Sequence, residues 1–90
     1  MSPQPAPPAV TVRYFAGARA AAGTTEEKVD TARDTTLASL LTHLVDLHGQ
    51  RLGAIVPACS FLVDGVAWHD HHAPMPDAAT VDILPPFAGG

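Results

Sequence analysis

Residues 36–49 read TLASLLTHLVDLHG, and this stretch decides how the rest of the chain folds. Five leucines recur at spacings of three and four residues, the period of one face of an α-helix. They are Leu37, Leu40, Leu41, Leu44 and Leu47. Thr36 is a good N-cap residue, and Gly49 is a good C-terminal stop. The pattern predicts one amphipathic helix from about residue 36 to 48, whose leucine stripe must be covered by another layer.

Strand-like segments precede this helix. Residues 9–15 alternate, with two valines and Tyr14 facing one way, which is typical of a half-buried strand. Residues 24–32 are polar and charged, and we interpret them as an antiparallel edge strand that pairs with the first. Between the two, residues 16–23 are expected to form an alanine-rich helical turn that Gly23 ends.

The second half of the chain carries three further strand patterns, at residues 59–63, 66–68 and 80–84. Asp64-Gly65 is a strong two-residue hairpin turn between the first two. Pro85-Pro86 ends the last strand, because proline cannot donate to a β-ladder. Residues 69–79 are expected to be a loop, and residues 52–56 are too short to assign.

The element order predicts an α+β protein in which one main helix packs on one face of a mixed sheet. If the last strand lies beside the first, the arrangement is a ubiquitin-like β-grasp. The predicted domain covers residues 9–84. Residues 1–8 are expected to be a disordered, proline-rich lead-in, and residues 85–90 an extended, flexible tail.

Composition excludes several classes of function. Ninety residues with a formal net charge of −4 make one small domain without a basic stripe for nucleic acid. The single cysteine, Cys59, excludes an internal disulfide. No apolar run is long enough for a membrane span, and the N-terminus does not resemble a secretory signal. We therefore expect a cytoplasmic protein that binds neither nucleic acid nor membrane.

The main candidate site is the tail. The sequence ends in Pro85-Pro86-Phe87-Ala88-Gly89-Gly90. The prolines direct the chain out of the sheet in an extended form. Gly89 and Gly90 have no Cβ, so the end can pass through a narrow channel. The α-carboxylate of Gly90 is a poor electrophile, but an ATP-dependent partner can convert it to an acyl-adenylate that a sulfur or amine nucleophile attacks.

Over residues 9–90 the chain resembles the small subunit of molybdopterin synthase, a β-grasp sulfur carrier. The resemblance is carried by VRYFAGAR at 12–19 with AAG at 21–23, by Thr36-Leu37, and by ILPPFAGG at 83–90. The chain departs from the family at two places. It has Asp77-Ala78-Ala79-Thr80 where an Asp-Gly-Asp turn is frequent, and Ala20 where a glutamate is common.

The resemblance implies that an adenylyltransferase related to ubiquitin-activating enzymes uses ATP to activate Gly90, and that a persulfide donor then supplies the sulfur of a thiocarboxylate. It implies that Gly89 is a slender link and that Phe87, Ala88 and Pro86 dock in the large subunit of the synthase, in a heterotetramer. There the sulfur would pass to a pterin precursor. The carrier is expected to contribute no catalytic groups of its own, and to bind no cofactor or metal.

Other functions remain open. The same carrier chemistry also serves cysteine, thiamine or thio-natural-product synthesis, although the long stretch at residues 50–70 argues against thiamine. A ubiquitin-like modifier that is joined to lysines would need the same tail. A plain binding module would need only the folded domain.

Side chains outside the tail have simpler interpretations. Phe15, Phe61 and Trp68 either fill the core or form a partner interface. Cys59 has apolar neighbours and is interpreted as a packing residue. The segment His69-Asp70-His71-His72 is interpreted as a solvated loop, since two imidazoles without a third ligand make a weak metal site.

Overall fold

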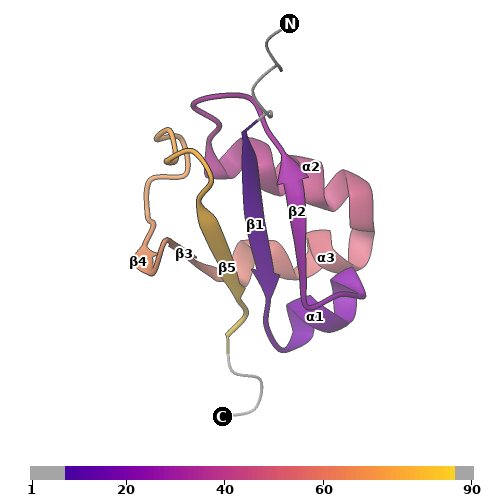
Figure 1. Ribbon diagram of the computed structural model, residues 1–90. Coiled ribbons are helices and arrows are strands. Elements are labelled where there is room, and N and C mark those ends of the chain that lie inside the picture. Colours follow the sequence, from indigo (N-terminus) through magenta and orange to yellow (C-terminus); the bar gives the residue numbers. More distant parts are fainter. Residues whose placement is uncertain (1–7, 87–90) are drawn as a thin grey trace, which may run out of the picture.

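The computed structural model describes residues 8–86, which form a five-stranded mixed sheet with helices on one face (Figure 1). The strands are β1 (Ala9–Tyr14), β2 (Glu26–Asp30), β3 (Ser60–Val63), β4 (Val66–Ala67) and β5 (Thr80–Leu84). The helices are α1 (Gly17–Ala22), α2 (Leu37–His48) and α3 (Gln50–Ile55), and a 3₁₀ turn, η1 (Val56–Ala58), follows α3. The strand order is β2-β1-β5-β3-β4. The last strand lies parallel beside the first, which confirms the β-grasp prediction.

Helix α2 carries the predicted leucine face. The Thr36 hydroxyl accepts a hydrogen bond from the Ser39 amide at 3.1 Å, so the predicted N-cap is present. The buried leucines of this helix are Leu37, Leu40, Leu41 and Leu44. Leu47 is 57% exposed, so its predicted place in the buried stripe is wrong. At about 100° per residue, Leu47 lies at the margin of the stripe, whereas His48 lies nearly in line with Leu37.

The core lies between the sheet and these helices. Val10, Val12 and Tyr14 alternate inward along β1, as predicted, and each is at most 2% exposed. Phe61 of β3 pairs in register with Ile83 of β5 and is only 5% exposed. Its aromatic ring therefore belongs to the core and is not free to form a partner interface.

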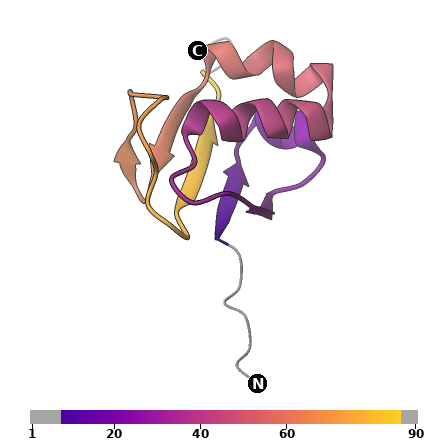
Figure 2. The same cartoon turned by 90° about the horizontal axis from the view of Figure 1, so that it is seen from above.

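Of residues 52–56, which the sequence left unassigned, residues 52–55 lie in helix α3 and Val56 begins η1. Leu52 is the buried residue of α3 and joins the core. Gly53 lets this short helix approach α2 closely, because a Cβ at position 53 would lie 3.0 Å from Cγ1 of Val45. Helices α2 and α3 consequently stack on the same side of the sheet, behind it in Figure 1 and together in Figure 2.

Turns and edges follow the predicted chemistry. Gly23 ends α1 in the left-handed conformation, with φ 75°. Asp64 and Gly65 both have positive φ, 50° and 80°, as a type I′ hairpin turn between β3 and β4 requires. Strand β2 pairs antiparallel with β1 at the edge of the sheet, so the edge-strand interpretation is confirmed.

Two predicted segments fall largely outside the described residues. Residues 1–7 of the lead-in and residues 87–90 of the tail lie beyond the ends of the described chain, so these expectations stay predictions. Within residues 8–86, no helix has the length and apolarity that a membrane crossing demands.

Candidate functional site

Strand β5 holds the root of the tail in the interior of the sheet. It pairs with β1 on one side and β3 on the other, and Leu84 lies opposite Ser60. The Phe15 amide donates a hydrogen bond to the Ile83 carbonyl at 3.3 Å. Leu84 and Pro85 are half-buried, and Pro86 is exposed. The tail therefore begins at a point that two neighbouring strands fix.

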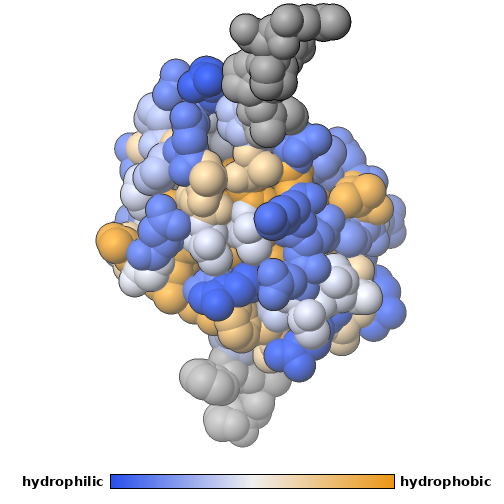
Figure 3. Space-filling model, viewed as in Figure 1, coloured by the Kyte–Doolittle hydropathy of each residue, from blue (hydrophilic) through white to orange (hydrophobic). Residues whose placement is uncertain are grey.

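An apolar groove of about 790 Å³ opens beside this root. Three separate segments line it: residues 15–17 at the β1–α1 turn, residues 54, 55 and 58 of α3 and η1, and residues 84–86. None of these lining residues is ionisable, so the groove offers shape and apolar contact but no acid, base or nucleophile. Figure 3 shows hydrophobic surface at the lower end of this view, together with separate patches elsewhere on the same face.

A strained turn forms one rim of the groove. Ala16 has φ 49° and ψ −125°, and the Ala18 amide donates to the Phe15 carbonyl at 3.0 Å. This geometry matches a type II′ turn, whose first central position favours glycine. An alanine there costs on the order of 1 kcal/mol, and strain of this kind tends to cluster at binding sites. The turn holds the half-buried Phe15 at the groove.

An ion pair on the open face of the sheet, the face opposite α2 and α3, joins β1 to β5. Arg13 Nε lies 2.6 Å from Asp82 Oδ1, and Arg13 Nη2 lies 2.8 Å from Asp82 Oδ2. The hydrogen bonds to Asp82 and its charge raise the pKa of Arg13. The Arg13 guanidinium carbon lies 5.8 Å from the centroid of the Phe15 ring. Sequence alone did not predict this pair, because its members are 69 residues apart.

A second polar cluster lies on the helix side of the sheet. The Tyr14 hydroxyl donates to Glu27 Oε2 at 2.8 Å, and His48 Nε2 lies 2.5 Å from the same oxygen. The Tyr14 and His48 rings meet edge to face at 5.7 Å. Burial raises the pKa of Tyr14, and the hydrogen bond to Glu27 adds to that effect. The cluster ties β1, β2 and α2 together beneath the sheet.

The three aromatic residues named as a partner interface are not brought together. Phe15 lies at the groove, and Phe61 lies in the core. Trp68 is half-buried beside a separate cavity of about 250 Å³, which Cys59 and His71 also line. Among the described residues the buried Trp68 Nε1 finds no hydrogen-bond partner.

Cys59 and the histidine segment occupy structural positions. Cys59 Sγ donates to the Ile55 carbonyl at 3.2 Å, and burial raises the pKa of its thiol. A raised pKa disfavours the reactive thiolate, in agreement with a packing role. His71 packs edge to face on the Phe61 ring at 5.3 Å. Between residues 8 and 86, no three His, Cys, Asp or Glu side chains gather in a way that would hold a metal ion.

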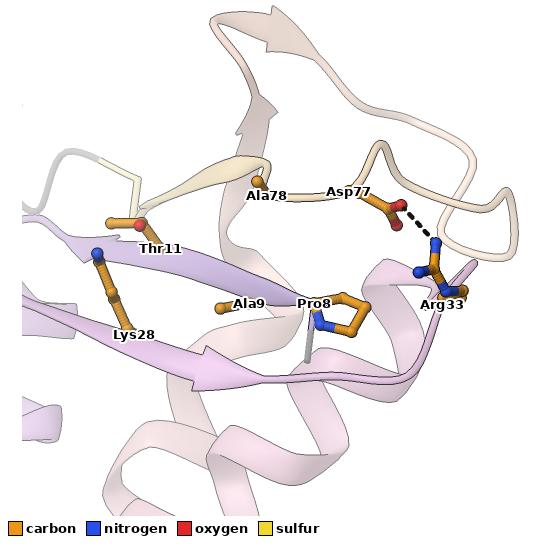
Figure 4. Close-up of a pocket in the computed structure, with 7 residues that line it drawn as sticks. All are labelled: Pro8, Ala9, Thr11, Lys28, Arg33, Asp77 and Ala78. Carbon is orange, nitrogen blue, oxygen red and sulfur yellow. Dashed lines mark ion pairs between the residues drawn. The ribbon is translucent and has the colours of Figure 1, made fainter. Parts of the chain in front are cut away.

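A polar cavity of about 480 Å³ lies at the opposite end of β5. Figure 4 shows Arg33 and Asp77 facing each other across its rim, with Lys28 on the far side. Arg33 Nη1 and Asp77 Oδ2 are 3.5 Å apart, and both side chains are exposed. Ala78 has φ 57°, in the turn where the sequence departs from the Asp-Gly-Asp pattern of the family that it resembles. This cavity is charged and open, unlike the groove at the tail.

Similar folds occur among solved structures. SAMP1 from Haloferax volcanii superposes with a TM-score of 0.80 at 23% identity, and the match covers 91% of this chain and 99% of that one. A chain of the complex of subunits 1 and 2 of molybdopterin-converting factor from Helicobacter pylori 26695 superposes with a TM-score of 0.67 at 20% identity. This match covers 91% of the present chain and 99% of that chain. Urm1 from Trypanosoma brucei superposes with a TM-score of 0.71 at 18% identity, and the match covers 91% of the present chain and 95% of Urm1. At these identities the likeness shows the fold.

Sequence comparison supplies the family. A search of curated proteins found no match. The family model described as "ThiS family" matches residues 12–90, which include every element of the sheet except the start of β1. This match confirms the resemblance to the β-grasp sulfur carriers. The chain belongs to the ThiS family and has a ubiquitin-like β-grasp fold.

Proposed function

We propose that this ThiS-family protein is the sulfur carrier of a molybdopterin synthase, in which Gly90 bears the sulfur as a thiocarboxylate. The observation that carries the proposal is the family match, which extends from the first strand to residue 90. The geometry supports it, because the tail begins at a strand that is anchored on both sides and leaves beside an apolar groove.

The proposed reaction starts at the Gly90 carboxylate. An adenylyltransferase joins it to the α-phosphorus of ATP and releases pyrophosphate. The terminal sulfur of a persulfide donor attacks the acyl carbon and displaces AMP. A second thiol then reduces the resulting acyl disulfide and leaves the thiocarboxylate on Gly90. ATP is thus a substrate of the partner, and the carrier binds no cofactor of its own.

The folded domain contributes position and contact to this reaction. The described groove lining holds no ionisable group, which fits a carrier whose partners supply the acids and bases. Pro85 and Pro86 restrict the backbone where the tail begins. Gly89 and Gly90 let the reacting end enter a narrow channel of the partner.

The proposed partners are the large synthase subunit, the adenylyltransferase and the persulfide donor. The Helicobacter pylori structure shows subunits 1 and 2 of that molybdopterin-converting factor in complex, which supports a large-subunit partner here. We propose that two carriers and two large subunits form a heterotetramer. The cytoplasm, where ATP is available to the adenylyltransferase, is the proposed compartment.

Reconstitution of the sulfur transfer from purified components tests whether a pterin precursor is the sulfur acceptor. The carrier is charged with sulfur by its adenylyltransferase and donor, and is then mixed with the large subunit and the pterin precursor. We expect molybdopterin to form in proportion to the thiocarboxylate consumed. Retention of the sulfur in this mixture, with discharge to a cysteine or thiamine precursor instead, would move the protein to another pathway.

A ubiquitin-like modifier is the second candidate. The fold likeness to small archaeal modifier protein 1 favours it over a plain binding module. The activated Gly90 would then join a lysine of a target protein. Lys28 is the only lysine in this sequence and lies exposed on the edge strand β2, so chains of the modifier would link through Lys28 or the N-terminus. Isopeptide-linked remnants of Gly89-Gly90 on host proteins would favour this reading.

A further inference from the structure

The apolar groove beside β5 has an aromatic residue of the same chain within immediate reach. Pro86 lines the groove, and Phe87 is the next residue. Consecutive Cα atoms lie about 3.8 Å apart, so chain connectivity keeps Phe87 within reach of the groove that Pro86 lines. Ala88, Gly89 and Gly90 carry at most a methyl group, so Phe87 is the one large apolar side chain in the segment from 87 to 90.

We propose that, in the free protein, the Phe87 ring occupies this groove and holds the tail against the domain. The groove volume of about 790 Å³ is ample for a phenyl ring. Ile55 and Phe15 offer apolar contact from two sides, and no charged group in the described lining opposes it. Among residues 87–90, only the Phe87 side chain would remove a large apolar area from water if it were buried.

Chain connectivity favours the tail over any other occupant of the groove. Pro85 and Pro86 have restricted backbones and already contact the groove, so seating the ring requires ordering of only one further residue. A separate molecule would lose its translational and rotational freedom in addition. A tethered ring also has a high effective concentration at the site.

This contact would control when the tail becomes available. While Phe87 is seated, Gly90 stays within three residues of the domain surface and cannot extend fully into a partner. A partner that supplies a better pocket for Phe87 would release the tail at the moment of docking. This consequence rests on the proposed carrier function, but the contact itself does not.

The two isoleucines of the chain allow a clean test. Ile55 lines the groove, whereas Ile83 is fully buried in the core. In the full-length protein with labelled isoleucine methyl groups, we expect nuclear Overhauser effects from the Phe87 ring to Ile55 and none to Ile83. In Phe87→Ala the Ile55 methyl resonances should shift, while those of Ile83 keep their positions.

Two further experiments distinguish Phe87 of the same chain from Phe87 of a second copy as the occupant of the groove: dilution of the protein, and a substitution that blocks the groove. A contact within one chain persists unchanged on tenfold dilution, whereas a contact between two copies weakens. In Ala54→Arg, which fills the groove from an exposed position of α3, carboxypeptidase should remove the tail faster than from the wild type. Absence of any Phe87–Ile55 effect, or its loss on dilution, would overturn the proposal. Neither measurement involves sulfur, so a failure here leaves the carrier function to its own test.

Discussion

The two ends of β5 differ in almost everything except the strand that joins them. At its start lie a charged, open cavity, the exposed pair Arg33–Asp77 and the strained Ala78. At its end lie an apolar groove without ionisable lining and the root of the tail. Figure 1 shows that β1, with which the described chain begins, starts near the first end of β5, and that the described chain ends beyond the second.

Under the proposed carrier function, this difference assigns the functional role to the end of β5 where the tail begins. A charged rim that is exposed to water contributes little to binding or stability, because solvent screens its ion pairs. An apolar concavity beside a reactive chain end can discriminate partners by shape and can position the chemistry. Changes at the C-terminal end of β5 should therefore affect activity strongly, and changes at the other end should affect only stability, and weakly.

Deletion of Gly90 should give the largest effect. Sulfur transfer is expected to vanish, because the shortened chain would present its carboxylate one residue too early for the partner. The fold should persist, because the buried core lies within residues 10–83. A pterin-conversion assay reports the activity, and circular dichroism reports the fold. A folded, fully active truncation would end the carrier account.

Gly89→Val should slow activation by about a hundredfold, while affinity for the adenylyltransferase falls far less. A β-branched side chain stiffens and widens the tail, and a displacement of about 1 Å at the reacting atom costs about that factor. Binding is spread over many contacts of the domain. The paired measurements are carrier-dependent ATP–pyrophosphate exchange and a binding titration. An equal loss in both would make the tail an anchor and not a threaded substrate.

Tyr14 should make the domain sensitive to alkali. The fold raises the pKa of Tyr14 above its ordinary value of 10.0, so the unfolded chain releases this proton first. Below pH 10.0, the ordinary pKa of tyrosine, the contribution of Tyr14 to the free energy of unfolding is therefore complete. As the pH rises above this value, the contribution falls by up to about 1.4 kcal/mol per pH unit.

Because Tyr14 is the only tyrosine, phenolate absorbance reports it alone. We expect no phenolate in the native protein near pH 10.0, and its appearance only as the chain unfolds. Denaturant unfolding of Tyr14→Phe should show a shallower alkaline slope and, at neutral pH, a loss of about 1 kcal/mol. Titration of native Tyr14 at its ordinary pKa would contradict the burial of its ring and its hydrogen bond to Glu27.

Ala78→Gly, at the other end of β5, should have the smallest effect and the opposite sign. Glycine adopts the positive φ of this position without strain, so we expect a stabilisation of about 1 kcal/mol and unchanged sulfur transfer. The matched control is Ala54→Gly in helix α3, which should destabilise by about 0.5–1 kcal/mol. If thermal unfolding showed that both variants destabilise the protein, the Ala78 turn would carry no strain.

Local patterns in the sequence were sufficient for most of the fold. The leucine spacing of α2, the alternation of β1 and the Asp64-Gly65 turn each depend on neighbours along the chain, and all three are present. Helix α3 was not assigned, because its six residues are too few to show a period. Leu47 was misplaced, because spacing alone does not tell the centre of a helix face from its margin.

The candidate site was predicted less completely. The tail motif was visible as a continuous run, but the groove beside it combines segments around residues 16, 55 and 85, which only the tertiary fold brings together. The Arg13–Asp82 pair likewise depends on the pairing of β1 with β5. The orientation of Phe61 follows from the register of β3 on β5, which the sequence did not specify.

Intact mass spectrometry can show directly whether Gly90 acquires sulfur. The wild-type protein is incubated with ATP, the adenylyltransferase and a persulfide donor, and the modified peptide is then located. For a carrier that is charged at Gly90, we expect a mass gain equal to the replacement of one oxygen by one sulfur, confined to the C-terminal peptide that contains Gly90 and retained in Cys59→Ser. An unchanged mass, or sulfur found on Cys59 and not on Gly90, would contradict this expectation.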